Sequence, residues 1–458
     1  MRSATATPPI RKVGMISLGC AKNLVDAEVM LGDAAAHGFQ ITADADDADV
    51  IVVNTCGFID SAKQESIDAI LEASGRIRPE QRLVVSGCLS QRYSRELRQE
   101  LPEVHAFIGL DQVAETGSIL NRLFETEDSV LDLVTRGSRY IPDYDTPRFQ
   151  LTPAHTAYVK IAEGCNHPCS FCVIPQMRGR HRSRAIDSVV REVRALVENG
   201  VREINLISQD TTYYGMDFWE QKAGPRQPVD SSRGVSLVRL LDALAEIEGD
   251  FWIRLLYTHP AHWSDELIAG IARNPKVVPY VDIPLQHIHS EMLQTMRRET
   301  SREHIENLLL RMRAGIPGLA IRTTFIIGFP GETEEHFESL LEFIERTRFE
   351  RLGVFSYSRE EGSRAAKMDG QIPTATKNRR HRKAMRLQQQ IAAEIAEAQL
   401  GRTIRVLVEQ ARAGRTSHDA PEVDCKVLLT ENAPIGKFIN AQITGTQVYD
   451  LVGEPLSA

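Results

Sequence analysis

The sequence predicts an α/β protein in three parts: an N-terminal domain with a parallel β-sheet, a central partial (β/α)6 barrel, and a small antiparallel β-barrel at the C-terminus. Three observations predict this fold class. Strand-length apolar runs alternate with helix-like stretches from Ile10 to Phe124, and the same alternation recurs six times after Tyr158. Beyond residue 400, short strand-like runs are instead separated by Gly, Pro and Asn.

Composition and charge exclude several classes of protein before any motif is considered. The 458 residues suffice for about three domains, and 42% hydrophobic content excludes disordered and collagen-like chains. The net charge of −8 excludes a protein that binds polyanions over its whole surface. No apolar stretch is long enough for a signal peptide or a membrane span, so we expect a cytoplasmic protein with no membrane partner. In that reducing compartment, seven cysteines are not expected to form a disulfide framework.

The first domain is predicted from three apolar runs, VGMISL, DVIVVN and RLVVS, which have strand length and many β-branched residues. Each run precedes a helix-like stretch, and this alternation favours a parallel sheet covered by helices. We place a flexible tail at residues 1–9, the domain at 10–126, and a connector, where the periodicity is lost, at 127–150.

The central domain, residues 151–390, carries six predicted strands, which lie at 157–162, 202–208, 251–257, 280–285, 321–327 and 351–357. Six strand–helix units favour a partial barrel over a closed eight-fold one. Ser183 or Asp187 could cap the helix predicted at 187–200. We interpret residues 217–234 as an inserted loop.

A long helix is predicted at residues 377–399, and the final domain occupies 391–458. In that domain the strand-like runs TIRVLVEQ, CKVLLT and KFINAQITGTQVYDLVG are short and are separated by turn-forming residues. About 58 residues of this kind predict the small antiparallel barrel.

The densest cysteine motif is EGCNHPCSFCVIP, in which Cys165, Cys169 and Cys172 follow a C-x3-C-x2-C spacing directly after a predicted strand. Three thiolates at this spacing can hold three irons of a [4Fe–4S] cluster and leave the fourth iron open for a substrate. The ends of barrel strands are also where active sites lie. The alternative is a structural zinc site with His167 or His181 as the fourth ligand, but the sequence lacks the second C-x2-C knuckle that such sites usually have.

Three other cysteines are distant in sequence but share one structural position. Cys20, Cys56 and Cys88 are 36 and 32 residues apart, about one βαβ unit, and each ends a predicted strand and begins a predicted helix. Because parallel strands end at one sheet edge and helix N-termini favour thiolates, we expect a second iron–sulfur cluster there. Taken singly, each would be an inert buried cysteine. Cys425 has no such partners, and we interpret it as structural.

These motifs together resemble a known family. A C-x3-C-x2-C motif after the first barrel strand resembles the signature of radical S-adenosylmethionine (SAM) enzymes. An upstream domain with three spaced cysteines and a C-terminal TRAM-like barrel resembles the methylthiotransferases. The resemblance runs from about Ile10 to the C-terminus and includes RGRHRSR, DIPLQH, TTFIIGFPGET and FSYSREEGS. It implies a transferase with a TIM-like radical SAM core, two [4Fe–4S] clusters and SAM, and no catalytic residue beyond the six cluster cysteines.

Within that family, the sequence is similar to the branch that modifies the β-carbon of an aspartate of ribosomal protein S12. LGCAKNLVDAE and the segments APEVD and YDLVGE resemble this branch, whereas the tRNA-modifying branch more often carries GCQMN. Ala21, His259 and Cys425 depart from the branch pattern, and none is an expected cluster ligand. The nearest alternative is a tRNA adenosine methylthiotransferase. An alternative of another class is a non-catalytic, zinc-containing ribosome- or RNA-binding factor.

The resemblance also implies the chemistry. The target CH2 group is unactivated, so a cofactor must supply a radical to remove its hydrogen. By resemblance, SAM binds the cluster at Cys165, Cys169 and Cys172 and is cleaved with one electron, the other cluster carries the sulfur, and a second SAM donates the methyl group. The implied partners are ribosomal protein S12, an electron donor such as a flavodoxin-type reductant, and a sulfur donor.

Polar residues at the predicted strand ends are candidates for binding SAM. Gln209 and Gln286 each follow a strand and could meet the methionine end and the ribose, although a satisfied loop amide is an alternative for both. GFPGE, residues 328–332, is expected to turn tightly near the adenine. Three residues near the first cysteines either orient that site or cap helices; these are Asn23, Asp26 and Asn54.

Charged segments supply two further expectations. The arginines of RGRHRSR form either a solvated loop or a carboxylate-binding site; they are Arg178, Arg180, Arg182 and Arg184. KNRRHRKAMR, residues 377–386, is either a solvated helix face or a contact to ribosomal RNA. The terminal barrel has six basic and seven acidic residues, and Asp419, Glu422 and Asp424 lie together in HDAPEVD. We expect these three carboxylates to attract a basic ribosomal protein.

Overall fold

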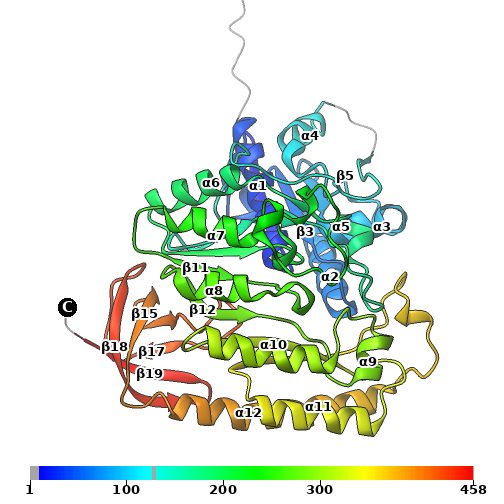
Figure 1. Ribbon diagram of the computed structural model, residues 1–458. Coiled ribbons are helices and arrows are strands. Elements are labelled where there is room, and N and C mark those ends of the chain that lie inside the picture. Colours follow the sequence, from blue (N-terminus) through cyan, green and yellow to red (C-terminus); the bar gives the residue numbers. More distant parts are fainter. Residues whose placement is uncertain (1–9, 126–129, 457–458) are drawn as a thin grey trace, which may run out of the picture. The chain divides into compact units, whose positions relative to one another are not determined.

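The computed structural model describes residues 10–125 and 130–456, so the tail predicted at 1–9 lies outside the described residues. The chain divides into two compact units. The first unit is the chain up to Leu151 together with Val173–Gly179, and the second is Thr152–Cys172 together with the chain from Arg180 onward. Figure 1 labels many of the elements of both units.

The first unit contains a six-stranded parallel sheet in the order β2-β1-β3-β4-β5-β6. Its strands are β1 (Lys12–Ser17), β2 (Gln40–Thr42), β3 (Val50–Thr55), β4 (Arg82–Ser86), β5 (Ala106–Phe107) and β6 (Leu131–Asp132). The three longest strands are the three apolar runs that the sequence predicts. The short strands β2, β5 and β6 extend the sheet beyond that prediction.

Helices cover both faces of this sheet. They include α1 (Ala21–Ala36), α2 (Asp60–Arg76), α3 (Gly87–Glu100) and α4 (Thr116–Arg122). Neighbouring residues of β3 point to opposite faces: Val52 packs in one apolar cluster with Leu31 of α1, and Val53 packs in another with Ile70 of α2. Burial on both faces explains why the central strands are apolar throughout.

The second unit contains a six-stranded parallel sheet in the order β14-β13-β12-β11-β10-β7, so neighbours in the sheet follow one another in the chain. Its strands are β7 (Thr156–Lys160), β10 (Glu203–Ile207), β11 (Trp252–Leu255), β12 (Val277–Asp282), β13 (Ala320–Ile327) and β14 (Arg351–Ser356). Each overlaps a predicted strand, and the predicted partial barrel of six strand–helix units is confirmed.

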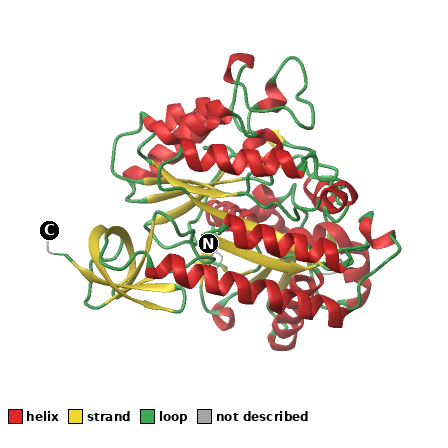
Figure 2. Cartoon of the chain, turned by 60° about the horizontal axis from the view of Figure 1, so that its bottom comes forward, coloured by secondary structure: helices red, strands yellow, loops and turns green. Residues whose placement is uncertain are grey.

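Figure 2 shows the helices in red around the yellow strands. In the second unit the helices are α6 (Ile186–Glu198), α7 (Leu237–Ala245), α8 (Asp265–Arg273), α9 (Ser290–Thr295), α10 (Arg302–Gly315), α11 (Glu334–Thr347) and α12 (Thr374–Glu397). The predicted cap of α6 is wrong, because the helix begins after Ala185 without a side-chain cap. Ser183 lies instead in β9 (Arg182–Ser183), which pairs with β8 (Ala162–Glu163).

After α12 the chain forms a closed five-stranded barrel, which lies beside the end of that helix in Figure 1. Its strands are β15 (Thr403–Gln410), β16 (Ala413–Thr416), β17 (Val427–Leu429), β18 (Phe438–Gln447) and β19 (Asp450–Pro455). The predicted small barrel is confirmed. It is antiparallel except where β17 pairs with β19 in parallel.

A buried ion network joins the barrel to the six-stranded sheet. Arg415 of β16 donates to Glu203 of β10 at 3.2 Å and to Glu409 of β15 at 2.9 Å. Arg254 of β11 donates to the same Glu203 oxygen at 2.8 Å. Glu203, Arg254 and Arg415 are at most 1% exposed. The barrel is therefore part of the second compact unit rather than an appendage to it.

The basic start of α12 is occupied by ion pairs with α11 and the turn before it. Arg380, only 4% exposed, donates to the Glu332 carboxylate at 2.5 Å. Arg379 pairs with Glu334 and Lys383 pairs with Glu338. The run is therefore not a free basic face, since much of its charge is neutralised within the fold. No helix among the described residues is long and apolar enough to cross a membrane.

Candidate metal centres

The first unit brings Cys20, Cys56 and Cys88 to one edge of its sheet. In the sheet register, Ser17 of β1 lies beside Asn54 of β3, and Asn54 lies beside Ser86 of β4. The cysteines follow these three residues at distances of three, two and two positions in the chain. Because the strands are parallel and adjacent, all three thiols lie at their carboxyl ends, as predicted.

The three cysteines differ in where they lie relative to the helix that follows each strand. Cys20 is the N-cap residue of α1, and Cys88 is the second residue of α3. Cys56 lies in the loop before α2, which begins at Asp60. The expectation that every cysteine of this triad begins a helix is therefore wrong for Cys56.

Glycines allow the three loops to approach one another closely. Gly19 has a φ of +90°, and a Cβ atom there would lie 2.8 Å from the Cβ atom and 3.1 Å from the sulfur of Cys56. A Cβ atom on Gly57 would lie 2.8 Å from the backbone of Cys88. Only glycine fits at these two places. The packing of the loops thus brings the three thiols together.

Arg178, in α5 (Ile174–Arg178), lies against this triad and is 4% exposed. Its Nη2 atom donates to Asp26 at 3.0 Å and to the sulfur of Cys88 at 3.3 Å. Of the two alternatives for the arginines of RGRHRSR, the solvated loop is therefore wrong for Arg178, which contacts a carboxylate within the chain. Its guanidinium instead supplies positive charge beside a group of thiols, where it stabilises thiolates.

Asn23 and Asn54 brace the loops of the triad. The Asn23 amide donates to Leu18 O at 2.6 Å and to Thr55 O at 3.3 Å, and the Asn54 amide donates to Asn23 O at 2.7 Å. No side chain caps α1. Of the two alternatives for these residues, orientation of the site agrees with the contacts, and capping of α1 does not.

The thiols of the first triad respond to their surroundings differently. Burial raises the pKa of Cys56 to about 11, with a further increase from the neighbouring thiols of Cys88 and Cys20. Partial desolvation raises the pKa of Cys20, but the charges of Lys22 and Arg178 and hydrogen bonds from the backbone of Asn23 and Lys22 outweigh this and leave the pKa below its ordinary value. Mutual influence of this kind requires that the thiols be close neighbours. Three adjacent thiols with a cation beside them fit a metal cluster, which binds them as thiolates.

The second triad occupies one loop after β8 in the second unit. The Cys172 N–H donates to Cys169 O at 3.2 Å, which curls the loop. Burial raises the pKa of Cys165 well above its ordinary value, and the nearby Asp210, Cys172 and Cys169 raise it further. Arg298, 8% exposed, places its Nη1 atom 3.5 Å from the sulfur of Cys169. These residues also fit a cluster of three thiolates, with a buried cation against one of them.

His167 lies between two cysteines of this loop and is held by two carboxylates. Its Nε2 atom is 2.7 Å from Asp210, and its Nδ1 atom is 2.6 Å from Glu299. Burial lowers the pKa of His167, but these two hydrogen bonds outweigh burial and raise it to about 9. Both ring nitrogens are thus occupied, and His167 is not available as a zinc ligand here.

His259 stacks on this imidazole with ring centroids 3.7 Å apart. The ring nitrogens of His167, His259 and His262 lie within 4.8 Å of one another, but no cysteine belongs to that group. His181, the other proposed zinc ligand, meets the hydroxyl of Ser183 at 3.1 Å. The sequence singles out His259 only as a departure from the family pattern, and gives no signal for Arg298 or Glu299.

Gln209 and Gln286 lie at the carboxyl ends of β10 and β12, as predicted. Gln209 donates to Glu163 at 2.5 Å, and its buried Oε1 atom has no partner among the described residues. The Oε1 atom of Gln286 likewise has no partner in the described chain, and its backbone has a φ of +73°. Two acceptors left open at strand ends fit a polar ligand.

The GFPGE turn is held by Glu332, which is 2% exposed. Glu332 accepts from the N–H of Gly328 at 2.7 Å and from Arg380 at 2.5 Å. Gly328 has a φ of +68°, and a Cβ atom there would meet the side chain of Lys377. The tight turn is therefore present, and a buried ion pair fixes it to α12.

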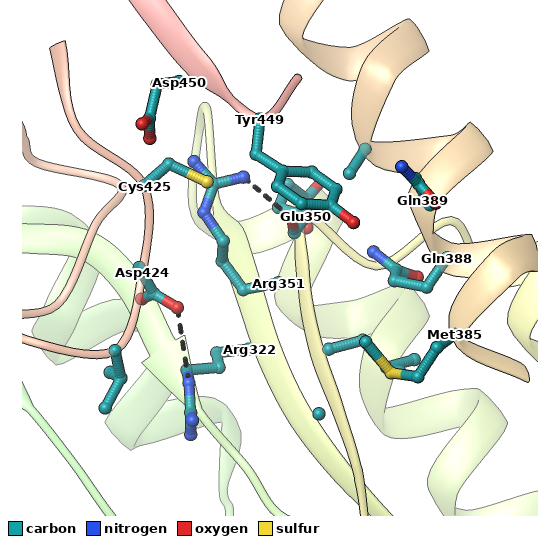
Figure 3. A pocket seen from close by; sticks show the side chains of 14 residues that line it. Arg322, Glu350, Arg351, Met385, Gln388, Gln389, Asp424, Cys425, Tyr449 and Asp450 are labelled. Carbon is teal, nitrogen blue, oxygen red and sulfur yellow. Dashed lines mark hydrogen bonds and ion pairs between the residues drawn. The ribbon is translucent and has the colours of Figure 1, made fainter. Parts of the chain in front are cut away.

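The segment HDAPEVD is not the exposed acidic surface that the sequence predicts. Asp419, 2% exposed, bonds to Arg351 at 2.9 Å and to Thr416 at 2.6 Å. Asp424 bonds to Tyr280 at 2.6 Å and lies 3.4 Å from Arg322, as Figure 3 shows for the arginine. Of the three carboxylates, only Glu422 is exposed. The expected docking role fails because two of the three acids bind arginines of the six-stranded sheet.

Cys425 lines a cavity of about 290 Å³ between the barrel, α12 and the start of β14. In Figure 3 its sulfur lies beside Arg351, and Tyr449 and Gln388 face the same space. Burial raises the pKa of Cys425 to about 12 despite Arg351. A neutral thiol away from both triads agrees with our interpretation of Cys425 as structural.

Comparison with known proteins finds three family models along the chain. The model "Uncharacterized protein family UPF0004" matches residues 12–109, "Radical SAM superfamily" matches 159–344, and "TRAM domain" matches 400–456. They fall in the order of the three predicted parts. The first covers the Cys20 triad and the second covers the Cys165 triad.

Relatives match over almost the whole chain. The "Ribosomal protein uS12 methylthiotransferase RimO" of Opitutus terrae is 57% identical over 97% of this chain and 96% of its own length. The protein with the same description from Akkermansia muciniphila is 53% identical over 96% of this chain and 99% of its own length. The radical S-adenosylmethionine methyltransferase TsrM of Kitasatospora setae has a TM-score of 0.53 at 14% identity, covering 75% of this chain and 72% of that chain, which shows a shared fold.

Proposed function

Because this chain belongs to the RimO family of methylthiotransferases, we propose that it transfers a methylthio group to an aspartate of ribosomal protein uS12. Identity of 57% extends over 97% of the chain, and the first-domain, radical SAM and TRAM models match in one order. The observation that carries the proposal is the presence of two separate groups of three cysteines, one in each compact unit. We divide the chain for this function at residues 10–126, 151–390 and 391–458.

The cofactors of the family are [4Fe–4S] clusters and SAM. In this proposal, Cys165, Cys169 and Cys172 hold the cluster to which SAM binds, and Cys20, Cys56 and Cys88 hold an auxiliary cluster. Bound together, these groups supply the radical that an unactivated CH2 requires and the sulfur that replaces its hydrogen. Gln209 and Gln286 contact SAM, which their open side-chain oxygens support.

The chain's own residues prepare both sites electrostatically. Arg178 at Cys88 and Arg298 at Cys169 each place a buried cation beside a ligand sulfur. A cation there favours the thiolate form that binds iron and offsets the negative charge that three thiolates bring. Asp210 and Glu299 hold His167 between Cys165 and Cys169, which fixes the loop before metal arrives.

Mass spectrometry of two substrates tests the proposed function. Anaerobically reconstituted protein is incubated with SAM, a strong reductant, and either uS12 or an anticodon-loop tRNA. We expect methylthio-aspartate on uS12 and no change in the tRNA. Modified tRNA with unmodified uS12 would overturn the proposal in favour of the sibling activity. Zinc in place of iron and sulfide would favour a non-catalytic factor.

The two triads are assigned by iron content and by partial reactions. Wild-type protein is expected to bind about eight irons, and each triple Cys→Ala variant about four. The variant lacking Cys20, Cys56 and Cys88 is expected to cleave SAM without forming product, and the variant lacking the other triad to lose cleavage. A wild type that saturates at about four irons would contradict the second cluster. Cys425→Ser, the matched control, should behave as wild type.

The reaction also needs two donors. One electron per SAM cleavage comes from a low-potential reductant of the flavodoxin type, and the inserted sulfur comes from a separate sulfur donor. Reconstituted protein that modifies uS12 repeatedly without added sulfide would contradict the need for a sulfur donor.

A further inference from the structure

A cationic pocket adjoins the loop of the second triad and is built wholly from the second unit. We call it the arginine pocket; it has a volume of about 410 Å³, and its charged lining is Arg226, Arg297, Arg298 and Glu299. Arg226 comes from the inserted loop at 217–234, which has no role in either metal centre. Arg297 and Arg298 follow α9 in the chain.

The charge of the arginine pocket is not neutralised by its own lining. Arg226 and Arg297 are exposed, and neither forms an ion pair within the described part of the chain. Glu299, the carboxylate of the lining, is already bonded to His167 at 2.6 Å. The pocket therefore presents two free guanidinium groups to an approaching anion.

The pocket is connected directly to a proposed cluster ligand. Pro168 lines it and precedes Cys169 in the chain, and the buried guanidinium of Arg298 lies 3.5 Å from the sulfur of Cys169. Two donors of the lining, Arg298 Nε and the Thr300 hydroxyl, are buried and have no acceptor among the described residues. Arg298 thus lines the same pocket as the exposed cations Arg226 and Arg297 and also lies against the sulfur of Cys169.

We propose that the arginine pocket is the docking site of the acidic protein that reduces the cluster at Cys165, Cys169 and Cys172; this rests on the proposed function. A flavodoxin-type donor presents carboxylates around its redox group, and opposite charges accelerate the encounter and orient it. On contact, the reduced donor loses one electron and the cluster gains that electron, with no bond formed or broken. Because electron transfer slows steeply with distance, docking beside Cys169 favours it.

Two observations favour an acidic protein over nucleic acid at this place. The two free cations of the arginine pocket occupy a small area on a chain of net charge −8, whereas an RNA-binding face needs an extended basic surface. The pocket also lies at the redox centre, where a reductant must arrive and RNA need not.

Charge reversal of the two exposed arginines tests the proposal. In Arg226→Glu/Arg297→Glu, SAM cleavage driven by reduced flavodoxin should fall at least about tenfold at low salt, and its salt dependence should weaken. Cleavage driven by reduced methyl viologen, a small cation, should stay within about twofold. The affinity for oxidised flavodoxin, measured by calorimetry on the iron-loaded protein, should fall in parallel. Arg194→Glu/Arg239→Glu, the matched control on α6 and α7, has the same charge change and should leave every readout unchanged.

Three outcomes would overturn the docking proposal. Flavodoxin-driven cleavage could be unchanged, or cleavage could fall equally with both reductants, which would place the arginines in SAM cleavage itself. The variant could also lose affinity for small ribosomal subunits while its flavodoxin-driven cleavage stays normal, which would make the pocket an RNA contact. Because the readouts are SAM cleavage and donor affinity, failure to modify uS12 would remove the proposed function without producing any of these results.

Discussion

Arg178 contacts two groups at once, the Asp26 carboxylate at 3.0 Å and the Cys88 sulfur at 3.3 Å. The Asp26 side chain is 4% exposed and the Arg178 side chain 5%. Removing one partner of such a buried pair leaves the other charge without compensation. That loss costs ~3–5 kcal/mol, whereas replacing both partners with apolar groups is often neutral.

Substitution of Arg178 separates its contribution to stability from its contribution to the metal site. Arg178→Met should lower the free energy of unfolding of the first unit by ~3–5 kcal/mol, measured by urea denaturation, and should lower its iron content. Asp26→Leu combined with Arg178→Met should recover most of the stability but not the iron, because the cation at Cys88 is still missing. Full recovery of iron in the double variant would show that Arg178 acts only through folding.

The spacing and strand positions of the cysteines predict which residues group together, and the sequence succeeds there because parallel strands end at one edge. It fails for Asp419 and Asp424, which look exposed in a polar segment. Their partners, Arg351 and Arg322, lie 68 and 102 residues earlier in the chain. Local sequence carries no sign of such a distant counter-charge, so burial of these acids was not predictable.

At the scale of elements, the turn between β1 and α1 depends on Gly19. Gly19 and Gly38, at the two ends of α1, have almost the same backbone conformation, with φ of +90° and +91°. A Cβ atom on Gly19 would collide with Cys56, whereas a Cβ atom on Gly38 would meet nothing within 4 Å. Comparison of the two glycines therefore separates two effects of adding a side chain. One is the free-energy cost of a left-handed conformation, and the other is the displacement of Cys56.

Alanine at each of these glycines should have different consequences for iron. Both Gly19→Ala and Gly38→Ala should lose ~1–2 kcal/mol of unfolding free energy from the left-handed conformation. Only Gly19→Ala should also lose iron from the first triad, because Cys56 must move. Iron and sulfide analysis after reconstitution measures this difference, and equal iron in the two variants would contradict it.

Glu409 of β15 makes the stability of the fold depend on pH. Burial raises the pKa of this carboxyl, but His155 and Arg415 outweigh burial and lower it from 4.5 to about 2. A lowered pKa in the folded state stabilises the fold above the ordinary pKa, and this contribution is lost as pH falls from about 4.5 toward 2.

Glu409→Gln should therefore have a lower urea midpoint than wild type at pH 7. The difference between the two proteins should shrink as pH falls below about 4.5, since the Glu409 carboxyl of the unfolded wild-type chain then takes up a proton while that of the folded chain stays charged until about pH 2. Glu431→Gln, on the same barrel and exposed, is the matched control and should show no such pH-dependent difference. A difference in urea midpoint that stays constant down to pH 3 would contradict the lowered pKa of Glu409.

Element prediction succeeds where a strand is long enough to show a pattern. All six strands of the second sheet and three of the first coincide with apolar runs. The strands β2, β5, β6 and β16 have two to four residues, too few for a period to be recognised. Their strand conformation comes from pairing with a neighbour rather than from their own residues.

At the scale of the whole molecule, the barrel and the six-stranded sheet share a buried network and belong to one compact unit. Arg415 contributes from the barrel, and Glu203 and Arg254 contribute from the sheet. Loss of the barrel would leave Glu203 with Arg254 alone and would expose both to water.

We accordingly expect the barrel to unfold with the sheet and not before it. Calorimetry should show no separate transition for residues 400–456, and limited proteolysis should yield no stable fragment that ends near residue 399. Arg415→Met should lower the melting temperature of the whole second unit, because Arg415 contacts both Glu203 and Glu409 and its loss leaves two carboxylates of the network with one arginine, Arg254. Arg402→Met, on the exposed side of the barrel, is the control. A barrel that melts alone would contradict this coupling.

The strand order β14-β13-β12-β11-β10-β7 has a consequence for synthesis of the chain. Each strand of this sheet pairs with the one translated before it, so the sheet grows at one edge while the protein is still emerging from the ribosome. Each pairing needs only the segment translated since the previous strand, as for Glu203 with Thr156 and for Trp252 with Glu203. Arg415 is translated 212 residues after Glu203, and until then Arg254 is the carboxylate's counter-charge. The strands of this sheet are therefore translated in the order in which they pair. Only the ion network between the sheet and the barrel requires the C-terminal part of the chain.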